Sequence, residues 1–279
     1  IVANNASGIS SGTEFDSYHT LASMRMVLPS GFILDTTDPN AEEKLKHAEP
    51  ELYRQIREIR DDILADVALQ ELIRHKFSIK NTMGYALNSF LDHDTVTEIL
   101  AHLMVGSEGT LGFIAAVGLR TREVHAHKAT ALLLFPSLEA AVDQVVGLEA
   151  LEPEALELMD DTALRAIRHV PGVPEVIRHD LQDGCAALLL EVAAGSLRSL
   201  HGKTRAAQKL LRGQELLSEV AFSEDPAQRE VLWKVRRELG PLHAAERPAG
   251  TIVISEDICF QLKDLAAGTR DLKQLLQVF

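Results

Sequence analysis

Short apolar runs that alternate with amphipathic helix patterns over residues 123–279 constrain the fold of this chain more than any other feature. Residues 131–135 and 185–192 have the length and apolarity of strands, the second those of a buried strand. The pattern predicts further strands at 155–158, 219–222 and 251–254, and helices at 138–146, 197–211, 231–239 and 262–276, with another helix beginning near Asp160. Strands that lead into helices suit a sheet covered on one face. A ferredoxin-like α+β sandwich explains this better than a doubly wound parallel sheet.

The first 122 residues follow a different pattern. Residues 24–28 and 32–34 are strand-like and are joined by a Pro-Ser-Gly turn, which predicts a hairpin. Residues 42–77 are rich in long charged side chains and predict a solvated helical insertion, not a binding patch. Its hydrophobic residues are expected on one helix face, and they are Leu52, Ile56, Ile59, Ile63 and Val67. A helix at 95–104, a glycine-rich turn at 106–112 and a strand at 114–119 complete this part.

Composition excludes several classes of protein. A net charge of −13 and a pI near 5.3 argue against nucleic-acid binding, which needs a basic surface. Cys185 and Cys259 alone cannot hold a zinc ion or an iron–sulfur cluster, and they suit a reducing compartment. No apolar run reaches the ~20 residues of a membrane helix, and no secretory signal is visible. Because the chain opens on Ile1 in what reads as the middle of a strand and turn, we expect its natural beginning to lie upstream.

Two small-residue segments are the candidates for ligand binding. G-S-E-G-T-L-G (106–112) frees the backbone for positive φ, and its successive amides can form an anion-binding nest. It is neither a P-loop nor a G-x-G-x-x-G fingerprint, and a tight structural turn is the alternative. A-N-N-A-S-G (3–8), followed by Ser11-Gly12-Thr13, can wrap a polar aromatic ligand. An ordinary Asn/Gly/Ser loop would read the same way.

Taken in order, A-N-N-A-S-G, N-T-M-G-Y-A-L-N (81–88) and G-S-E-G-T-L-G resemble the FAD-linked oxidases of the D-lactate dehydrogenase and glycolate oxidase type, in the vanillyl-alcohol oxidase fold superfamily. The likeness is to the long form, which is fused to an iron–sulfur domain. The resemblance implies an α+β fold: an incomplete FAD-binding (PCMH-type) domain and a ferredoxin-like substrate (cap) domain. The implied boundaries are 1–40 for the second part of the FAD-binding domain, 41–95 for the helical insertion, 96–122 for the glycine turn and strand of the FAD-binding domain, and 123–279 for a C-terminally truncated cap.

The resemblance also implies roles for residues. One wall of the flavin cleft would be formed by Asn5, Ala6, Ser7, Gly8 and Gly12. The other wall would be formed by Gly106, Ser107, Glu108, Gly109, Thr110 and Gly112, with Ile114 against the isoalloxazine. The two bends should then face each other across a slot for a flat ring. In L-W-K-V-R (232–236), Arg236 would bind the substrate carboxylate, with Arg237 as second candidate and a helix-surface arginine as the alternative reading.

Some family features are missing from the sequence. The glycine-rich subdomain before the first motif and the histidine-rich G-H…G-N-x-H segment after the last helix are absent, and so is the iron–sulfur domain. Where some relatives place a substrate-binding lysine, Ser255 precedes Glu256 and Asp257. His125 and His127 could form a metal pair on a strand, but a surface pair is favoured, and a loop position is favoured for His243. We expect no metal ligands here.

The sequence therefore predicts an FAD-dependent oxidoreductase that oxidises a D-2-hydroxy acid, D-lactate-like, by hydride transfer to the flavin. The fragment alone is expected to be inactive. One alternative is a non-enzymatic binding or assembly module that pairs through sheet edges. Another is a subunit of the glycolate oxidase type. The expected partners are a small hydroxy acid and an unidentified electron acceptor, without nucleic acid. The expected location is cytoplasmic, with room for peripheral association with the inner face of the membrane.

Overall fold

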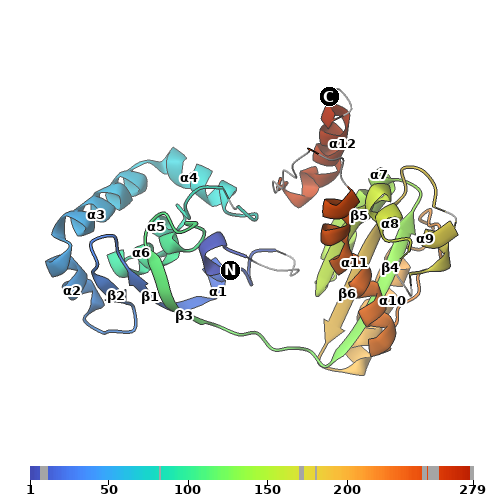
Figure 1. The fold of residues 1–279 in the computed structure, drawn as a ribbon, viewed down its shortest axis with the longest axis horizontal. Coiled ribbons are helices and arrows are strands. Elements are labelled where there is room, and N and C mark those ends of the chain that lie inside the picture. Colours follow the sequence, from blue (N-terminus) through green and yellow to red (C-terminus); the bar gives the residue numbers. More distant parts are fainter. Residues whose placement is uncertain are drawn as a thin grey trace. The chain divides into compact units, whose positions relative to one another are not determined.

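The chain forms two compact units. The computed structural model describes residues 1–6, 12–81, 83–169, 173–179, 181–246, 250 and 258–276, and only the backbone of 235 and 238–246. The described residues up to Glu123 form unit 1, and those from Val124 onward form unit 2 (Figure 1). No described helix is both long enough and apolar enough to cross a membrane.

Unit 1 contains a three-stranded antiparallel sheet in the order β2-β1-β3, built from β1 (Leu21–Val27), β2 (Ile33–Asp35) and β3 (Phe113–Leu119). The predicted hairpin is confirmed, since Val27 pairs with Ile33 in the β1–β2 ladder. Met24 and Met26 of β1 are fully buried in the core of the unit. The strand predicted at 114–119 is β3, which pairs with the other edge of β1.

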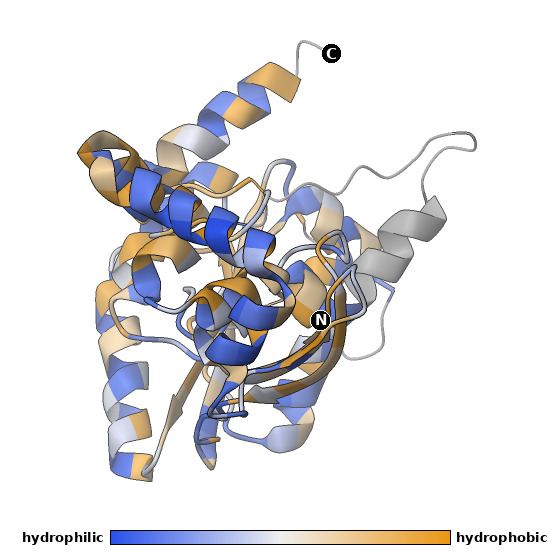
Figure 2. Ribbon diagram, turned by 90° about the vertical axis from the view of Figure 1, so that its left-hand side faces the viewer, coloured by the Kyte–Doolittle hydropathy of each residue, from blue (hydrophilic) through white to orange (hydrophobic). Residues whose placement is uncertain are grey.

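The charged insertion is helical, as predicted, but it is broken into α2 (Ala41–Ala48), α3 (Pro50–Ala65) and α4 (Val67–Lys76). Pro50 begins α3, and Asp66 caps α4 by accepting a hydrogen bond from an α4 amide. The single apolar face predicted across these helices is wrong in part. Ile59 is 44% exposed and Val67 is 66% exposed, because the break at Asp66 separates Val67 from the stripe of α3. Hydrophilic and hydrophobic residues alternate along the helices in Figure 2.

Helix α6 (Val96–Met104) is the central element of unit 1, and all its residues except Glu98 are buried. Its N-terminus is held by the insertion, since the Glu42 carboxylate of α2 accepts hydrogen bonds from the amides of Val96 and Thr97, each at 3.0 Å. A carboxylate there satisfies free N–H groups and complements the helix dipole. The remaining short elements of this unit are η1 (Val2–Asn4), α1 (Ser17–Thr20) and α5 (Ser89–Asp92).

Unit 2 contains the antiparallel sheet β4-β6-β5, formed by β4 (His127–Phe135), β5 (Ala155–Asp160) and β6 (Ala186–Ala194). With α7 (Leu138–Glu149) after β4 and α10 (Leu197–Leu210) after β6, the chain runs β-α-β-β-α apart from two short helices between β5 and β6, and the last strand lies between the first two. This is the order of a ferredoxin-like unit up to its final strand. The strand predicted at 251–254 lies outside the described residues. The strand predicted at 219–222 is wrong, since only an isolated bridge joins Ser223 to Thr130 there.

The unit 2 sheet is covered on both faces, which corrects the expectation of one covered face. Helices α7 and α10 pack on one face, and α8 (Asp161–Ala166), α9 (Glu175–His179) and α11 (Pro226–Glu246) contribute to the other. Every residue of β6 is buried, because its continuous apolar run faces two cores. Farther along the chain, η2 (Leu262–Asp264) and α12 (Leu265–Leu276) pack on α7, where Lys273 pairs with Glu139 at 3.6 Å.

Candidate functional site

The three motif segments converge in unit 1. The Gly106 amide donates to the Val2 carbonyl at 3.1 Å, and the Glu108 amide donates to the Ala3 carbonyl at 2.8 Å. Tyr85, in the middle motif, places its hydroxyl 2.9 Å from the Thr110 hydroxyl. The two bends therefore contact each other through backbone hydrogen bonds, and no slot for a flat ring separates the parts of them that the structure describes. The middle motif joins the same cluster.

A small cavity opens beside this junction. It is lined by residues of all three motifs and of α1 and its N-cap, namely Asn5, Thr13, Asp16, Tyr18, His19, Phe77, Ile79, Asn81, Gly84, Ala86, Asn88, Val105 and Gly106. The enclosed volume is about 20 Å³, which is the room for about one water. The Asn88 amide oxygen is buried and has no hydrogen-bond partner among the described residues. Its amide nitrogen donates to Asp92 at 3.0 Å, which fixes the orientation of this amide.

The A-N-N-A-S-G segment is tied to α1. Asn5 has a left-handed backbone (φ 50°), and its side-chain oxygen accepts the Tyr18 amide at 3.0 Å while its nitrogen donates to Asp16 at 3.3 Å. The Ala6 carbonyl accepts the Ser17 hydroxyl at 3.1 Å. Ser7 and Gly8 lie outside the described residues. Gly12 is described and has a φ of 71°, with open space where a Cβ would stand.

The glycine turn uses its polar groups internally. Gly106 and Gly109 have φ of 75°, and Glu108 has φ of 51°, so the predicted positive-φ backbone is confirmed. The amides of residues 106, 107, 108 and 110 all donate to backbone carbonyls, so these four are not available for an anion nest. The hydroxyls of Ser107 and Thr110 donate to the carbonyls of Met104 and Ser107 at 2.8 and 2.6 Å. These side chains stabilise the end of α6 and the turn itself.

Gly112 and Ile114 belong to the packing of unit 1. A Cβ at Gly112 would lie 2.8 Å from the Val27 carbonyl oxygen, so glycine is required for the close approach of β1. Ile114 is half-buried and packs against the core of the unit.

Several polar residues of the site carried no recognised sequence motif. The His19 ring lies 2.8 Å from Asp16, which is 4% exposed, and this hydrogen bond raises the pKa of His19 although burial opposes it. The buried Tyr18 donates its hydroxyl to Asp92 at 2.7 Å. Burial, followed by this bond, raises the pKa of the Tyr18 phenol. In the sequence, only the adjacency of Tyr18 and His19 just before the strand β1 could have pointed to these two residues.

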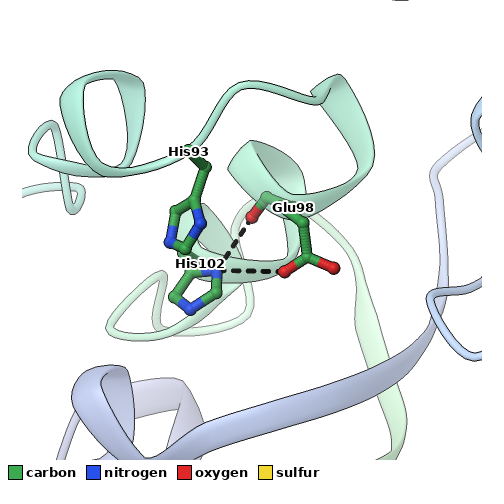
Figure 3. A group of neighbouring side chains, drawn as sticks. All are labelled: His93, Glu98 and His102. Carbon is green, nitrogen blue, oxygen red and sulfur yellow. Dashed lines mark hydrogen bonds and ion pairs between the residues drawn. The ribbon is translucent and has the colours of Figure 1, made fainter.

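Two histidines and a glutamate, His93, Glu98 and His102, form a cluster in unit 1 (Figure 3). The His93 and His102 rings stack with centroids 3.8 Å apart, and the Tyr18 ring meets His102 edge-on at 4.9 Å. His102 Nδ1 is 2.9 Å from the Glu98 carbonyl oxygen and 3.8 Å from its carboxylate. Burial and the neighbouring His102 lower the pKa of His93 to about 4, and burial lowers the pKa of His102. Both rings are therefore neutral near pH 7.

Unit 2 holds the candidate carboxylate-binding arginine. Arg236 Nε donates to Glu157 of β5 at 2.9 Å, and neither terminal nitrogen has a bond to a described residue. Arg237 instead points to an exposed pair with Glu230. Ser255, Glu256 and Asp257 lie outside the described residues, as does the side chain of His243. His127 begins β4, whereas His125 precedes it, and its Nδ1 is buried without a described partner.

A buried carboxylate anchors the helix that carries Arg236. Glu191 of β6 is 3% exposed and accepts hydrogen bonds from Trp233 Nε1 at 2.6 Å and from the Thr130 hydroxyl at 2.7 Å. Arg229 and Lys128 each approach it to 3.3 Å. Burial alone would raise the pKa of Glu191, but these hydrogen bonds and the two cations outweigh it and hold the pKa below its usual value.

A larger pocket of about 470 Å³ in unit 2 is lined mainly by apolar side chains of β4 and α11, including Leu132, Leu134 and Leu232. The only charged residue in its lining is Glu219. An anionic substrate would be repelled there, so this pocket is a poor candidate for hydroxy-acid binding.

Comparison with known proteins places the chain in a family. A family profile, "FAD linked oxidases, C-terminal domain", matches residues 124–279, more than half of the chain. The mitochondrial D-lactate dehydrogenase [cytochrome] of Arabidopsis thaliana is 28% identical over 169 residues, which are 60% of this chain and 28% of that protein. A D-2-hydroxyglutarate dehydrogenase of Haemophilus influenzae is 22% identical over 274 residues, 93% of this chain and 27% of that protein.

Solved structures agree on the fold. A structure of alkyldihydroxyacetonephosphate synthase superposes with a TM-score of 0.51 and 14% identity, covering 87% of this chain and 36% of that one. The two units thus define an α+β chain with the fold of the FAD-linked oxidases. The chain belongs to the FAD-linked oxidase family. It spans less than a third of the length of the two dehydrogenases.

The donor set of unit 1 fits one wall of a flavin site. The cavity lining is rich in side-chain amides, and the buried Asn88 oxygen is an acceptor that lacks a donor. An isoalloxazine ring carries N–H and carbonyl groups that such amides can pair with. The enclosed 20 Å³ is far too small for the ring, so these residues could line an edge of the cofactor without enclosing it.

Proposed function

We propose that this chain is the central part of an FAD-dependent dehydrogenase of D-2-hydroxy acids, with D-lactate as the preferred substrate class. In this proposal unit 1 contributes to the flavin site through 1–40 and 96–122, with 41–95 as an insertion, and residues 123–279 form the substrate-side cap. When bound, FAD supplies the acceptor for the hydride of the substrate Cα–H bond. The family membership and the names of both dehydrogenase relatives support a hydroxy-acid substrate.

The observation that carries the flavin proposal is the convergence of three motif segments, distant in sequence, around one cavity with an unpaired Asn88 oxygen. The cavity is lined by three asparagines, Asn5, Asn81 and Asn88. A buried amide group without a hydrogen-bond partner costs free energy unless a ligand satisfies it. We assign Asn88 to a cofactor N–H. Because the amides of residues 106, 107, 108 and 110 already donate to backbone carbonyls, we assign Gly106–Gly112 the role of shaping the wall of the site.

In unit 2, we assign Arg236 to the substrate carboxylate. Its Nε is held by Glu157, which leaves the two terminal nitrogens as a fork that matches the two oxygens of a carboxylate. Glu157 orients this fork and offsets its charge when no substrate is bound. Because the α-carbon of a 2-hydroxy acid is bonded to this carboxylate, a fixed orientation of the fork would also position the Cα–H bond, which contributes to rate.

Kinetics of the complete gene product test the substrate proposal. Dye reduction is measured with D-lactate, D-2-hydroxyglutarate and glycolate, and FAD content is measured separately from the visible absorbance. We expect Arg236→Lys to raise KM for the preferred acid about tenfold or more, because a point charge replaces a bidentate fork. Arg237→Lys, an adjacent exposed arginine, is the matched control and should leave KM unchanged. The assignment is wrong if the control moves KM and Arg236→Lys does not.

FAD retention tests the flavin wall. Asn88→Ala should weaken FAD binding about tenfold, the worth of one buried hydrogen bond, whereas Asn40→Ala, at an exposed asparagine without a side-chain capping bond, should not. Equal FAD affinity in the wild type and Asn88→Ala would remove Asn88 from the site.

A further inference from the structure

One cluster of side chains in unit 1 has no part in the proposed reaction. His93, Glu98 and His102 bring one ligand atom each to within 4.8 Å of one another (Figure 3). Glu98 and His102 are four residues apart on α6 and share a face, and His93 lies in the turn just before that helix. We propose that these three side chains bind a divalent transition-metal ion, with zinc the ion that suits two imidazoles and a carboxylate best.

The distances are close to those of a metal site. Ligand atoms about 2.0–2.1 Å from a tetrahedral zinc lie about 3.3–3.5 Å from each other. His102 Nδ1 is already 3.8 Å from the Glu98 carboxylate, and the widest separation in the group is below 4.8 Å. Small rotations of the side chains therefore close the site, and the backbone does not have to move.

The backbone around the cluster is held from several sides. Arg60 of α3 donates from Nε to the His93 carbonyl at 3.1 Å and also pairs with Asp94. Thr95 caps α6 by accepting the Glu98 amide at 3.3 Å. Preorganised supports of this kind reduce the entropy lost when ligands gather around an ion.

The contacts that the metal would replace are weak ones. The two rings stack, and His102 Nδ1 lies 2.9 Å from the Glu98 carbonyl oxygen. One hydrogen bond between neutral groups and one ring contact are small beside ligation of a metal by two imidazoles.

Charge and access also favour a cation. Asp92 and Asp94 flank His93; Asp94 is paired with Arg60, so Asp92 and Glu98 supply the negative charge near the rings. The Glu98 side chain is 44% exposed, which gives an ion a path from solvent. Three protein ligands leave a fourth position for water. Because α6 ends at Met104, just before the turn that starts at Gly106, a bound ion would rigidify the helix that carries this turn.

Titration of the 279-residue chain with Co²⁺ after EDTA treatment and dialysis tests the site. We expect one ion per chain, the intense visible bands of four-coordinate cobalt, and displacement by Zn²⁺. Changes to second-shell residues alone can weaken metal sites 10–100-fold, so loss of a ligand in Glu98→Gln or His93→Gln should weaken binding at least about tenfold. His102 is left intact because it is 5% exposed and its replacement could unfold the unit.

His47→Gln is the matched control. Glu43 and His47 on α2 have the same spacing, and His47 Nδ1 lies 2.8 Å from the Glu43 carbonyl, yet no third ligand joins them among the residues that the structure describes. Zn²⁺ should raise the melting temperature of the wild type and of His47→Gln, and not that of Glu98→Gln. The proposal is overturned if the wild type binds no ion, or if Glu98→Gln and His93→Gln bind as tightly as the wild type.

Discussion

Replacing Glu191 with glutamine should destabilise unit 2 strongly, although the two side chains have nearly the same shape. The wild-type carboxylate accepts close hydrogen bonds from Trp233 and Thr130 and faces the cations of Arg229 and Lys128. Glutamine can keep the two close bonds, but only as neutral ones. Each such bond then loses about 1 kcal/mol, the difference between charge-assisted and neutral hydrogen bonds.

The cations add to this loss. Arg229 keeps no buried counter-charge at this position in Glu191→Gln, whereas Lys128 still pairs with Glu154 at 3.3 Å. Breaking a buried ion pair from one side typically costs about 3–5 kcal/mol. This range already includes the weakened hydrogen bonds. Since the lysine remains paired and the arginine is partly solvated, we expect the lower end of the range, a total loss of about 3 kcal/mol.

The assay uses the only tryptophan of the chain, Trp233, which bonds directly to Glu191. Urea unfolding at pH 7, followed by its fluorescence, reports on unit 2 alone. A loss of about 3 kcal/mol moves the midpoint by about 1–3 M at the usual urea slopes. Glu230→Gln on the same helix, with a 68% exposed side chain, is the control and should move it by less than about 0.3 M. Equal midpoints for Glu191→Gln and this control would refute the reasoning.

The same carboxylate predicts a pH dependence. The folded state lowers the pKa of Glu191, so its stabilisation is complete above the unfolded value and is lost as the pH falls through the folded one. The gap in stability between the wild type and Glu191→Gln should therefore narrow below pH 4.5, the ordinary value for glutamate. A gap that widens in acid would contradict this sign.

Three smaller predictions follow from unit 1. Gly112→Ala should destabilise unit 1 by about 1–3 kcal/mol, because its Cβ would lie 2.8 Å from a β1 carbonyl oxygen. Thermal unfolding followed by circular dichroism measures this loss, and an unchanged melting temperature would contradict the predicted clash. Asp66→Ala should cost about 1 kcal/mol through the lost helix cap, whereas Asn40→Ala, at a cap position without a side-chain bond, should cost less than half of that in urea unfolding. His19→Gln should destabilise most at low pH: the bond to Asp16 raises the pKa of His19, so its stabilisation is present below pH 6.5 and disappears as the pH rises through the folded value. Equal effects of His19→Gln at pH 5.5 and pH 9 would count against that ion pair.

Hydrophobic periodicity predicted where helices and strands form better than it predicted what packs against them. The run at 185–192 was predicted as a buried strand and is β6, but its neighbours on both faces depend on how distant helices pack. The strand predicted at 219–222 has apolar residues of the right type. However, the segment forms no ladder with β4: Ser223 makes an isolated bridge to Thr130, and the Leu217 amide donates to the Leu134 carbonyl at 2.8 Å. Hydrophobic patterns specify which side chains avoid water, and not which edge of a sheet is open.

The candidate site, too, could be predicted from the sequence only in part. Positive φ at Gly106 and Gly109 followed from residue type, since glycine adopts that backbone without a Cβ clash. The hydrogen bonds of the turn amides could not be predicted from residue type. The acceptors of the Gly106 and Glu108 amides, Val2 and Ala3, lie about a hundred residues away in sequence. His93 and His102 could not be paired from the sequence either. The E-x-x-x-H spacing occurs five times, starting at Glu43, Glu71, Glu98, Glu123 and Glu175, and only folding shows which histidine has a further ligand beside it.

The helical insertion also takes part in the architecture of the site. Glu42 binds the first amides of α6, and its neighbour Tyr53 on α3 donates to the same carboxylate at 2.9 Å. Arg60, also on α3, holds the carbonyl of His93. Removing the insertion would therefore expose unpaired N–H groups at the start of α6, the helix whose other end carries the glycine turn. One face of these amphipathic helices is exposed to water. Charged residues of the same helices, such as Glu42 and Arg60, also form hydrogen bonds that hold backbone groups of the neighbouring segments. The geometry of the proposed flavin wall thus depends on residues 41–95 as well as on the motifs themselves.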